Sequence, residues 1–141
     1  MICATKNMIT LIGCGGREVA VARALGGRNI RVLAPYVNPQ LKMLVSEYRV
    51  TTDYTAGAQG SEFVFCGPEA PICAGLADAV PNCICPTQAN AQIESDKLFA
   101  RWCIDAFFPM QNYNPRYSAI GMNNAHDVRQ FDEVVIKHVG L

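Results

Sequence analysis

The sequence predicts an α/β protein with a doubly wound, parallel sheet, and three observations carry this prediction. Short apolar segments that contain β-branched residues alternate with segments of helical periodicity along most of the chain. The first apolar segment enters a glycine-rich turn that opens directly into a helical pattern. Half of the 141 residues are apolar, so one domain of this length can bury a substantial core.

The first part of the chain is expected to alternate strictly between strands and helices. The expected elements are a strand at 8–13, a helix at 18–25, a strand at 29–35, a helix at 38–48 and a strand at 48–53. The first strand is apolar throughout, which suits a strand covered on both faces. Gly26 and Gly27 end the first helix, and Asn38 and Pro39 serve as N-cap and first residue of the second.

The next part continues the alternation. The segment 54–60 is too short and too glycine-rich for a full helix. It is followed by a strand that breaks at Gly67 and Pro68, a helix at 70–80, a strand at 82–87 and a long helix at 90–107. A weak strand signal lies at 116–120 and a clear one within 131–141. A strand so close to the end of the sequence predicts that the polypeptide stops inside a second domain.

Composition narrows the class of protein. Twelve basic and twelve acidic residues cancel, and they form no block of like charge, so neither a nucleic acid nor an anionic membrane is expected as a partner. The sequence lacks a secretory signal pattern and any apolar run of membrane-spanning length, so we expect a cytoplasmic protein.

The cysteines are odd in number and lie mostly in apolar runs, which predicts buried free thiols in a reducing compartment. They are Cys3, Cys14, Cys66, Cys73, Cys83, Cys85 and Cys103. Cys83 and Cys85 would share one face of a strand. Core packing is favoured over metal ligation for this pair, because it lacks the spacing of a metal site.

The glycine turn only partly matches a dinucleotide-binding fingerprint. Gly13 and Gly15 fit the pattern, but Glu18 occupies the place of the third glycine, and the second predicted strand ends without an acidic residue. The turn can still expose backbone N–H groups to an anion at a helix N-terminus, with Gly16 beside them. Arg17 suits a phosphate, and Glu18 could accept from a ribose hydroxyl or an amine. The alternative is a bare turn with a solvated Arg and Glu.

A second loop is expected on the same edge of the sheet. Gly67, Pro68 and Glu69 follow the fourth predicted strand, and the carboxyl ends of parallel strands share one edge. The Glu69 carboxylate could receive a cationic or hydroxyl group. Alternatively, it only favours the N-terminus of the next helix.

Four segments resemble, in order, the N-terminal part of the phosphoribosylamine-glycine ligase family. They read LIGCGGREVAVA, FVFCGPEAPICAGLAD, CPTQANAQIESDKLFAR and DEVVIKHVGL. The resemblance implies a Rossmann-like pre-ATP-grasp domain at 1–94, followed at 95–141 by a linker helix and the truncated beginning of an ATP-grasp domain. It also implies a ligase that uses ATP and magnesium to form glycyl phosphate and then joins glycine to 5-phosphoribosylamine.

The resemblance also implies roles for individual residues. Gly15, Gly16, Arg17 and Glu18, preceded by Gly13, are expected to face the phosphoribosylamine, and Gly67, Pro68 and Glu69 are expected on the other side of that pocket. Lys97 and Lys137 match the lysines that ATP-grasp proteins turn toward nucleotide phosphates. The alternatives are a solvated helix lysine and a strand-edge lysine. No catalytic or metal-ligating residue is expected within this chain.

Three departures from the family pattern limit these expectations. Val19 stands where the family usually has histidine, the connection at 54–60 is short, and the sequence stops before the ATP loop and the magnesium ligands. The chain alone is therefore expected not to ligate, and a separate chain carrying the ATP-grasp lobe is a candidate partner. Two alternatives remain open: a non-catalytic sugar-phosphate-binding module, and a fragment of another ATP-grasp enzyme such as a biotin carboxylase or a purine-pathway carboxylase.

Overall fold

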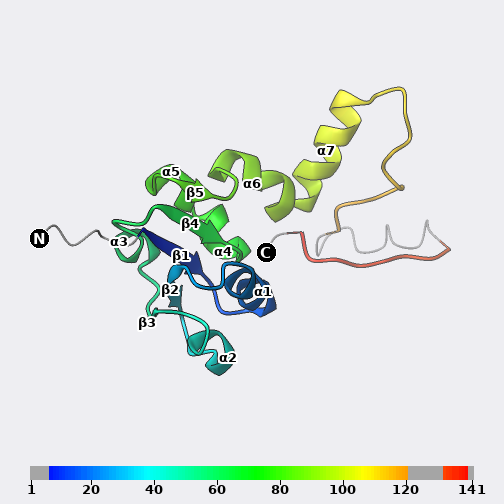
Figure 1. Ribbon diagram of the computed structural model, residues 1–141. Coiled ribbons are helices and arrows are strands. Elements are labelled where there is room, and N and C mark those ends of the chain that lie inside the picture. Colours follow the sequence, from blue (N-terminus) through cyan, green and yellow to red (C-terminus); the bar gives the residue numbers. More distant parts are fainter. Residues whose placement is uncertain (1–6, 121–131, 140–141) are drawn as a thin grey trace, which may run out of the picture. The chain divides into compact units, whose positions relative to one another are not determined.

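A five-stranded, fully parallel sheet with helices on both faces forms the core of the computed structural model, which describes residues 7–120 and 132–139 (Figure 1). The strands are β1 (Met8–Ile12), β2 (Asn29–Ala34), β3 (Glu47–Val50), β4 (Phe63–Cys66) and β5 (Cys83–Ile84), in the order β3-β2-β1-β4-β5. Central β1 pairs with β2 and β4, so that Ile12 stands beside Leu33 and Cys66. The sheet confirms the predicted α/β class and the first five predicted strands, although β5 is limited to Cys83–Ile84.

The helices are short. They are α1 (Gly16–Ala24), α2 (Pro39–Lys42), α3 (Tyr54–Gly57), α4 (Glu69–Cys73), α5 (Leu76–Ala79), α6 (Gln88–Ser95) and α7 (Lys97–Phe107). The chain divides into two compact units, Met1–Ala91 and Gln92–Leu141, and the sheet lies in the first. No helix among the described residues has the length and apolar character needed to span a membrane.

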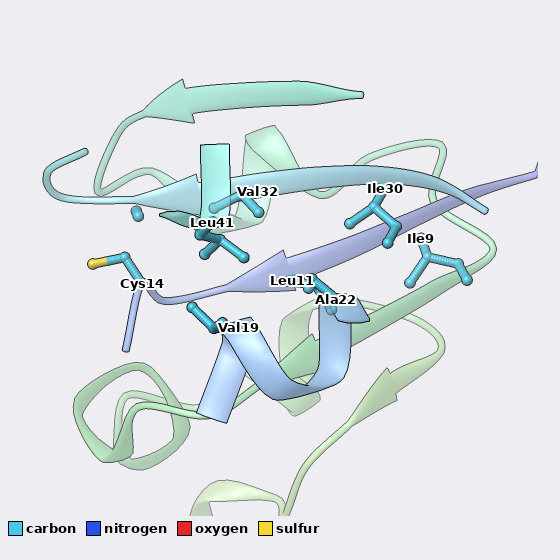
Figure 2. Packing of buried hydrophobic residues seen from close by; sticks show 9 residues of the cluster. Ile9, Leu11, Cys14, Val19, Ala22, Ile30, Val32 and Leu41 are labelled. Carbon is cyan, nitrogen blue, oxygen red and sulfur yellow. The ribbon is translucent and has the colours of Figure 1, made fainter. Parts of the chain in front are cut away.

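Alternating residues of the strands build two cores, one on each face of the sheet. Ile9 and Leu11 of β1 pack with α1 and α2. Ile12 packs on the opposite face, with Ala58 just after α3 and with α5. Figure 2 shows the first of these cores, in which Val19 and Ala22 of α1 lie against Leu11. The strand run Met8–Ile12 is apolar on nearly every position because both faces are covered.

The predicted helix at 38–48 is wrong in length, since α2 ends at Lys42. Its start is confirmed, because Asn38 Oδ1 accepts from the backbone N–H groups of Gln40 and Leu41 at 3.0 and 3.2 Å. Leu41 is the buried residue of this turn, while Met43 is 86% exposed. A longer helix would also include the residues that connect α2 to β3, which pairs with β2.

Two other predicted helices are broken. The helix at 70–80 divides into α4 and α5 at Gly75, which has a left-handed φ of 86°. The helix at 90–107 divides at Asp96, whose Oδ1 accepts from the N–H groups of Leu98 and Phe99 and caps α7. The segment 54–60 forms only the one-turn helix α3, as the sequence indicates.

The strands predicted at 116–120 and within 131–141 are absent from the residues described there, 116–120 and 132–139. Residues 131, 140 and 141 lie outside the description. Val135 and Ile136 are about four-fifths exposed, at 81% and 77%. The described part of the chain offers them no partner strand, and a strand needs neighbours as well as β-branched residues.

The six described cysteines are free thiols, and Cys3 lies outside the description. Only Cys14 and Cys66 are buried, so the prediction of burial is wrong for Cys73, Cys83, Cys85 and Cys103, which are half-buried. Cys83 lies in β5 and Cys85 one residue beyond its end, so the prediction of a shared strand is wrong for Cys85, although 3.5 Å separates the two sulfur atoms. Burial raises the pKa of the Cys66 and Cys83 thiols to about 12.

Candidate functional site

The two loops singled out by sequence leave adjacent strands on the same edge of the sheet. The loop 13–15 follows β1 and leads into α1, and the loop 67–68 follows β4 and leads into α4. Because β1 pairs with β4 in parallel, Ile12 and Cys66 stand side by side and the loops begin together. We call this edge the rim; it is where open α/β sheets bind ligands.

Contacts between side chains of α1 and the second loop hold the rim together. The Arg17 guanidinium Nη1 donates to the backbone carbonyl of Gly67. The Glu18 carboxylate Oε2 accepts from the backbone N–H of Gly15 at 2.7 Å, which satisfies one of the unpaired donors at the start of α1. Arg17 and Glu18 therefore both bind backbone groups of the rim.

The glycines of the rim differ in backbone conformation and in the space available for a side chain. Gly13 has a φ of 113°, and a Cβ atom there would lie 2.7 Å from Cγ of Pro68. Gly15 has an ordinary extended backbone with φ −87°, and Gly16, the first residue of α1, has open space at its Cβ position. A Cβ atom on Gly67 would stand 1.9 Å from Oε1 of Glu18. Only Gly13, of the three glycines in the first turn, uses its freedom of φ.

Exposure separates the predicted residues into two groups. Gly15, Gly16 and Arg17 are exposed, as is Glu69, the first residue of α4. Glu18 is buried, with 3% of its surface exposed. The helix N-terminus therefore presents backbone N–H groups and a guanidinium at the surface, a donor set that suits an anionic group.

Asn38 is a rim residue that the sequence analysis identified only as a helix cap. Its Nδ2 donates to the backbone carbonyl of Cys14 at 2.8 Å, which joins the end of β2 to the first loop. Its own N–H donates to the Tyr48 hydroxyl, which in turn donates to the Tyr36 carbonyl at 2.9 Å. The sequence could have indicated this contact, because an Asn that caps a helix through its side-chain oxygen still has an NH₂ group that can donate to another residue.

Val19, where the resemblance predicts histidine, is 6% exposed and belongs to the core on the α1 face of the sheet (Figure 2). An apolar side chain here adds to packing between α1 and β1. The departure therefore has a structural role in this chain.

Lys97 and Lys137 lie in the second unit, and both are exposed. Lys97 is the first residue of α7, and its backbone N–H donates to the carbonyl of Val139 at 3.1 Å. Val139, two residues after Lys137, thus contacts the start of α7.

The second unit also contains a surface cavity of about 580 Å³, and no residue of either rim loop lines it. Asp105 of α7 organises one side of this cavity by accepting from Asn114 Nδ2 at 2.7 Å and from the Tyr117 hydroxyl at 2.9 Å. These polar groups satisfy each other and hold the 112–118 segment against α7.

The resemblance to the ligase family implies magnesium. Within residues 7–120 and 132–139, no three His, Cys, Asp or Glu side chains converge in a way that could hold a metal ion. The described residues therefore contain no cluster that could hold magnesium by protein ligands alone.

Comparison with known proteins gives the family. Residues 7–94, which include both rim loops, match the model of the phosphoribosylglycinamide synthetase N domain. The chain is 31% identical to the phosphoribosylamine–glycine ligase of Pyrococcus horikoshii and 34% identical to that of Methanoregula boonei. Each match covers 94% of this chain but only 34% and 35% of the relative, so the chain spans about a third of the length of these relatives.

A solved structure supports the same fold. The N5-carboxyaminoimidazole ribonucleotide synthetase of Thermotoga maritima superposes with a TM-score of 0.58 at 18% identity, covering 89% of this chain and 36% of that one. At this identity the likeness concerns the fold alone. The match to the N-domain model spans most of the chain, and the chain accordingly belongs to the phosphoribosylglycinamide synthetase family.

Proposed function

We propose that this chain binds 5-phosphoribosylamine at the rim, as the N-terminal part of a phosphoribosylamine–glycine ligase of purine biosynthesis. The observation that carries the proposal is the pairing of the two loops. The N-domain match covers both of them, and the parallel register of β1 and β4 brings them to one edge. The names of the relatives supply the substrates, phosphoribosylamine and glycine.

The proposed roles follow from the exposed groups. The N–H groups of Gly16 and Arg17, in the first turn of α1, and the Arg17 guanidinium receive the sugar phosphate. The exposed carboxylate of Glu69 accepts from a ribose hydroxyl or from the amine. Gly13, Gly15, Gly67 and Pro68 form the wall between the loops, and Glu18 belongs to the same wall.

The overall reaction joins the substrate amine to the carboxyl group of glycine. ATP transfers its terminal phosphoryl group to the glycine carboxylate, and ADP leaves. The amine nitrogen attacks the acyl carbon, the bond from carbon to the phosphate oxygen breaks, the nitrogen loses a proton and phosphate is released. The chain's contribution is to hold the amine in place for this attack, which removes much of the entropic barrier.

For ATP we propose Lys97 and Lys137 as charges that face the nucleotide phosphates. The support is their match to the family motifs and the contact between the Lys97 N–H and Val139. A separate chain that carries the ATP-grasp lobe would supply the groups that bind magnesium. The free thiols are consistent with a cytoplasmic site of action.

The test of sugar-phosphate binding is calorimetry with ribose 5-phosphate, a stable probe that carries the same phosphate and sugar. Arg17→Ala should weaken binding by about 1.5 to 3 kcal/mol, the range for a hydrogen bond to a charged group. Arg23→Ala, in the last turn of α1, is the matched control and should bind as the wild type does. Equal affinity of the wild type and Arg17→Ala would refute the assignment of this loop.

The catalytic part of the proposal has a separate test. Addition in trans of the ATP-grasp portion of the Pyrococcus horikoshii relative should produce ligase activity that depends on glycine and on this chain. A chain that binds ribose 5-phosphate but never supports ligation would be a binding module instead.

A further inference from the structure

The buried carboxylate of Glu18 is the least expected feature of the rim. Among the described residues only two polar side chains are buried, those of Thr10 and Glu18. The Thr10 hydroxyl lies 2.7 Å from the hydroxyl of Ser61 and is thereby satisfied. A buried charge must have close polar partners, because removal from water otherwise costs several kcal/mol.

Three glycines surround this carboxylate. A Cβ atom would lie 3.0 Å from its Cδ if placed on Gly13, 3.2 Å from Oε2 if placed on Gly15, and 1.9 Å from Oε1 if placed on Gly67. Two of these glycines belong to the loop after β1 and the third follows β4. The side chain of Glu18 therefore lies between the two loops, in space that is open because positions 13, 15 and 67 are glycine.

We propose that Glu18 is a positioning residue, which fixes the spacing of the two rim loops and does not itself bind the sugar phosphate. Its Oε2 holds the N–H of Gly15, and its Oε1 sits against Gly67, whose carbonyl receives Arg17. Gly67 is thus held between two consecutive residues of α1. A side chain at position 67 would therefore force the Glu18 carboxylate out of its place, whether or not a ligand is bound.

The N-terminus of α1 makes this placement favourable for a charged carboxylate. Glu18 lies in the first turn, where the helix dipole and the unpaired N–H groups stabilise negative charge. A phosphate at the same helix end would then be held by the N–H groups and the guanidinium that remain exposed. This part of the inference rests on the proposed function.

A double-mutant cycle measured by urea unfolding tests the packing without any ligand. Gly67→Ala should lower the unfolding midpoint in the wild type, and it should lower it much less in a Glu18→Ala background, where the contact at 1.9 Å is absent and only Arg17 Cδ, at 3.3 Å, remains close. Gly16→Ala is the matched control, since a Cβ atom there meets nothing within 4 Å, and it should not lower the midpoint. If Glu18→Ala does not fold, Glu18→Asp withdraws the carboxylate by one carbon and serves in its place. Equal midpoint losses for Gly67→Ala in both backgrounds would overturn the proposal.

A second measurement separates positioning from direct binding. Glu18→Gln keeps the length of the side chain and an oxygen for the Gly15 N–H, so it should retain affinity for ribose 5-phosphate within about threefold of the wild type, while Glu18→Ala should lose at least about tenfold. Equal losses for the two variants would identify the charge as a direct ligand and overturn the positioning role. If the wild type does not bind ribose 5-phosphate, the proposed function fails, and the unfolding cycle still decides the role of Glu18.

Discussion

Asn38 joins two loops of the rim with opposite ends of one side chain. Its Oδ1 caps α2 at the end of β2, and its Nδ2 donates at 2.8 Å to the backbone carbonyl of Cys14 in the loop after β1. A conventional dinucleotide site has an acidic residue near the end of the second strand. Here that region contains an amide that binds the protein's own backbone.

Two substitutions at Asn38 separate these functions. Asn38→Asp keeps the cap acceptor but removes the donor to Cys14, and we expect it to reduce the free energy of unfolding by about 1 kcal/mol. Asn38→Ala removes both interactions and should cost about 2 kcal/mol. Urea unfolding measures both values. An Asn38→Asp variant as stable as the wild type would mean that the bridge to Cys14 contributes nothing.

Glu47 predicts a loss of stability in acid. The hydrogen bond from Arg31, at 2.8 Å, and a second contact from Arg49 hold the pKa of Glu47 below that of an ordinary carboxyl. This stabilisation is present above the unfolded-state pKa of about 4.3 and disappears as the pH falls through the lower folded-state value.

The corresponding measurement compares unfolding free energies from pH 6 down to acid in the wild type and Glu47→Gln. The variant should lose less stability over this interval, because it has no carboxylate to protonate. Glu94→Gln, which changes an exposed carboxylate of α6, should follow the wild-type curve. Parallel curves for the wild type and Glu47→Gln would contradict the role of the Arg31 pair.

Cys66 predicts the opposite trend in alkali. Burial raises the pKa of its thiol to about 12, so the folded protein keeps the proton after the unfolded chain, with a pKa of about 8.5, has lost it. Stability from this group is complete below about pH 8.5 and declines as the pH rises toward 12. Cys66→Ala should show a flatter decline in urea unfolding than Cys103→Ala, and equal slopes would argue against a buried neutral thiol.

The sequence predicted the sheet well because its strands are buried on both faces. Leu11, Val32 and Val64, within the apolar runs of β1, β2 and β4, are fully buried. The same reasoning failed for Val135 and Ile136, where β-branched residues form no strand among the described residues. Propensity alone cannot supply the neighbour that a strand requires.

Helix lengths were less predictable because local caps compete with periodicity. Asp96 lies inside an otherwise continuous helical pattern, yet its carboxylate binds the next N–H groups and starts a new helix there. For the candidate site, the sequence predicted that both loops lie on one edge of the sheet, but it did not predict the burial of Glu18. That burial depends on Gly13 and Gly67, which are 54 positions apart, leaving space at the same point.

Asp96 itself provides a test of this competition. Asp96→Ala should lower the stability of α7 by about 1 kcal/mol, whereas Asp96→Asn retains the cap and should cost only a few tenths. Thermal unfolding followed by circular dichroism compares the two variants. Equal destabilisation by both would show that the charge, and not the cap, fixes the start of α7.

Sugar-phosphate binding at the rim is tested most directly by a ¹H–¹⁵N NMR titration of the 141-residue chain with ribose 5-phosphate. Ribose, which lacks the phosphate, is the control. We expect saturable shifts of the Gly15, Gly16, Arg17 and Glu69 amides with ribose 5-phosphate, weaker shifts in Arg17→Ala, and little change with ribose. Rim amides that do not move, or that move equally in wild type and Arg17→Ala, would contradict sugar-phosphate binding at the rim.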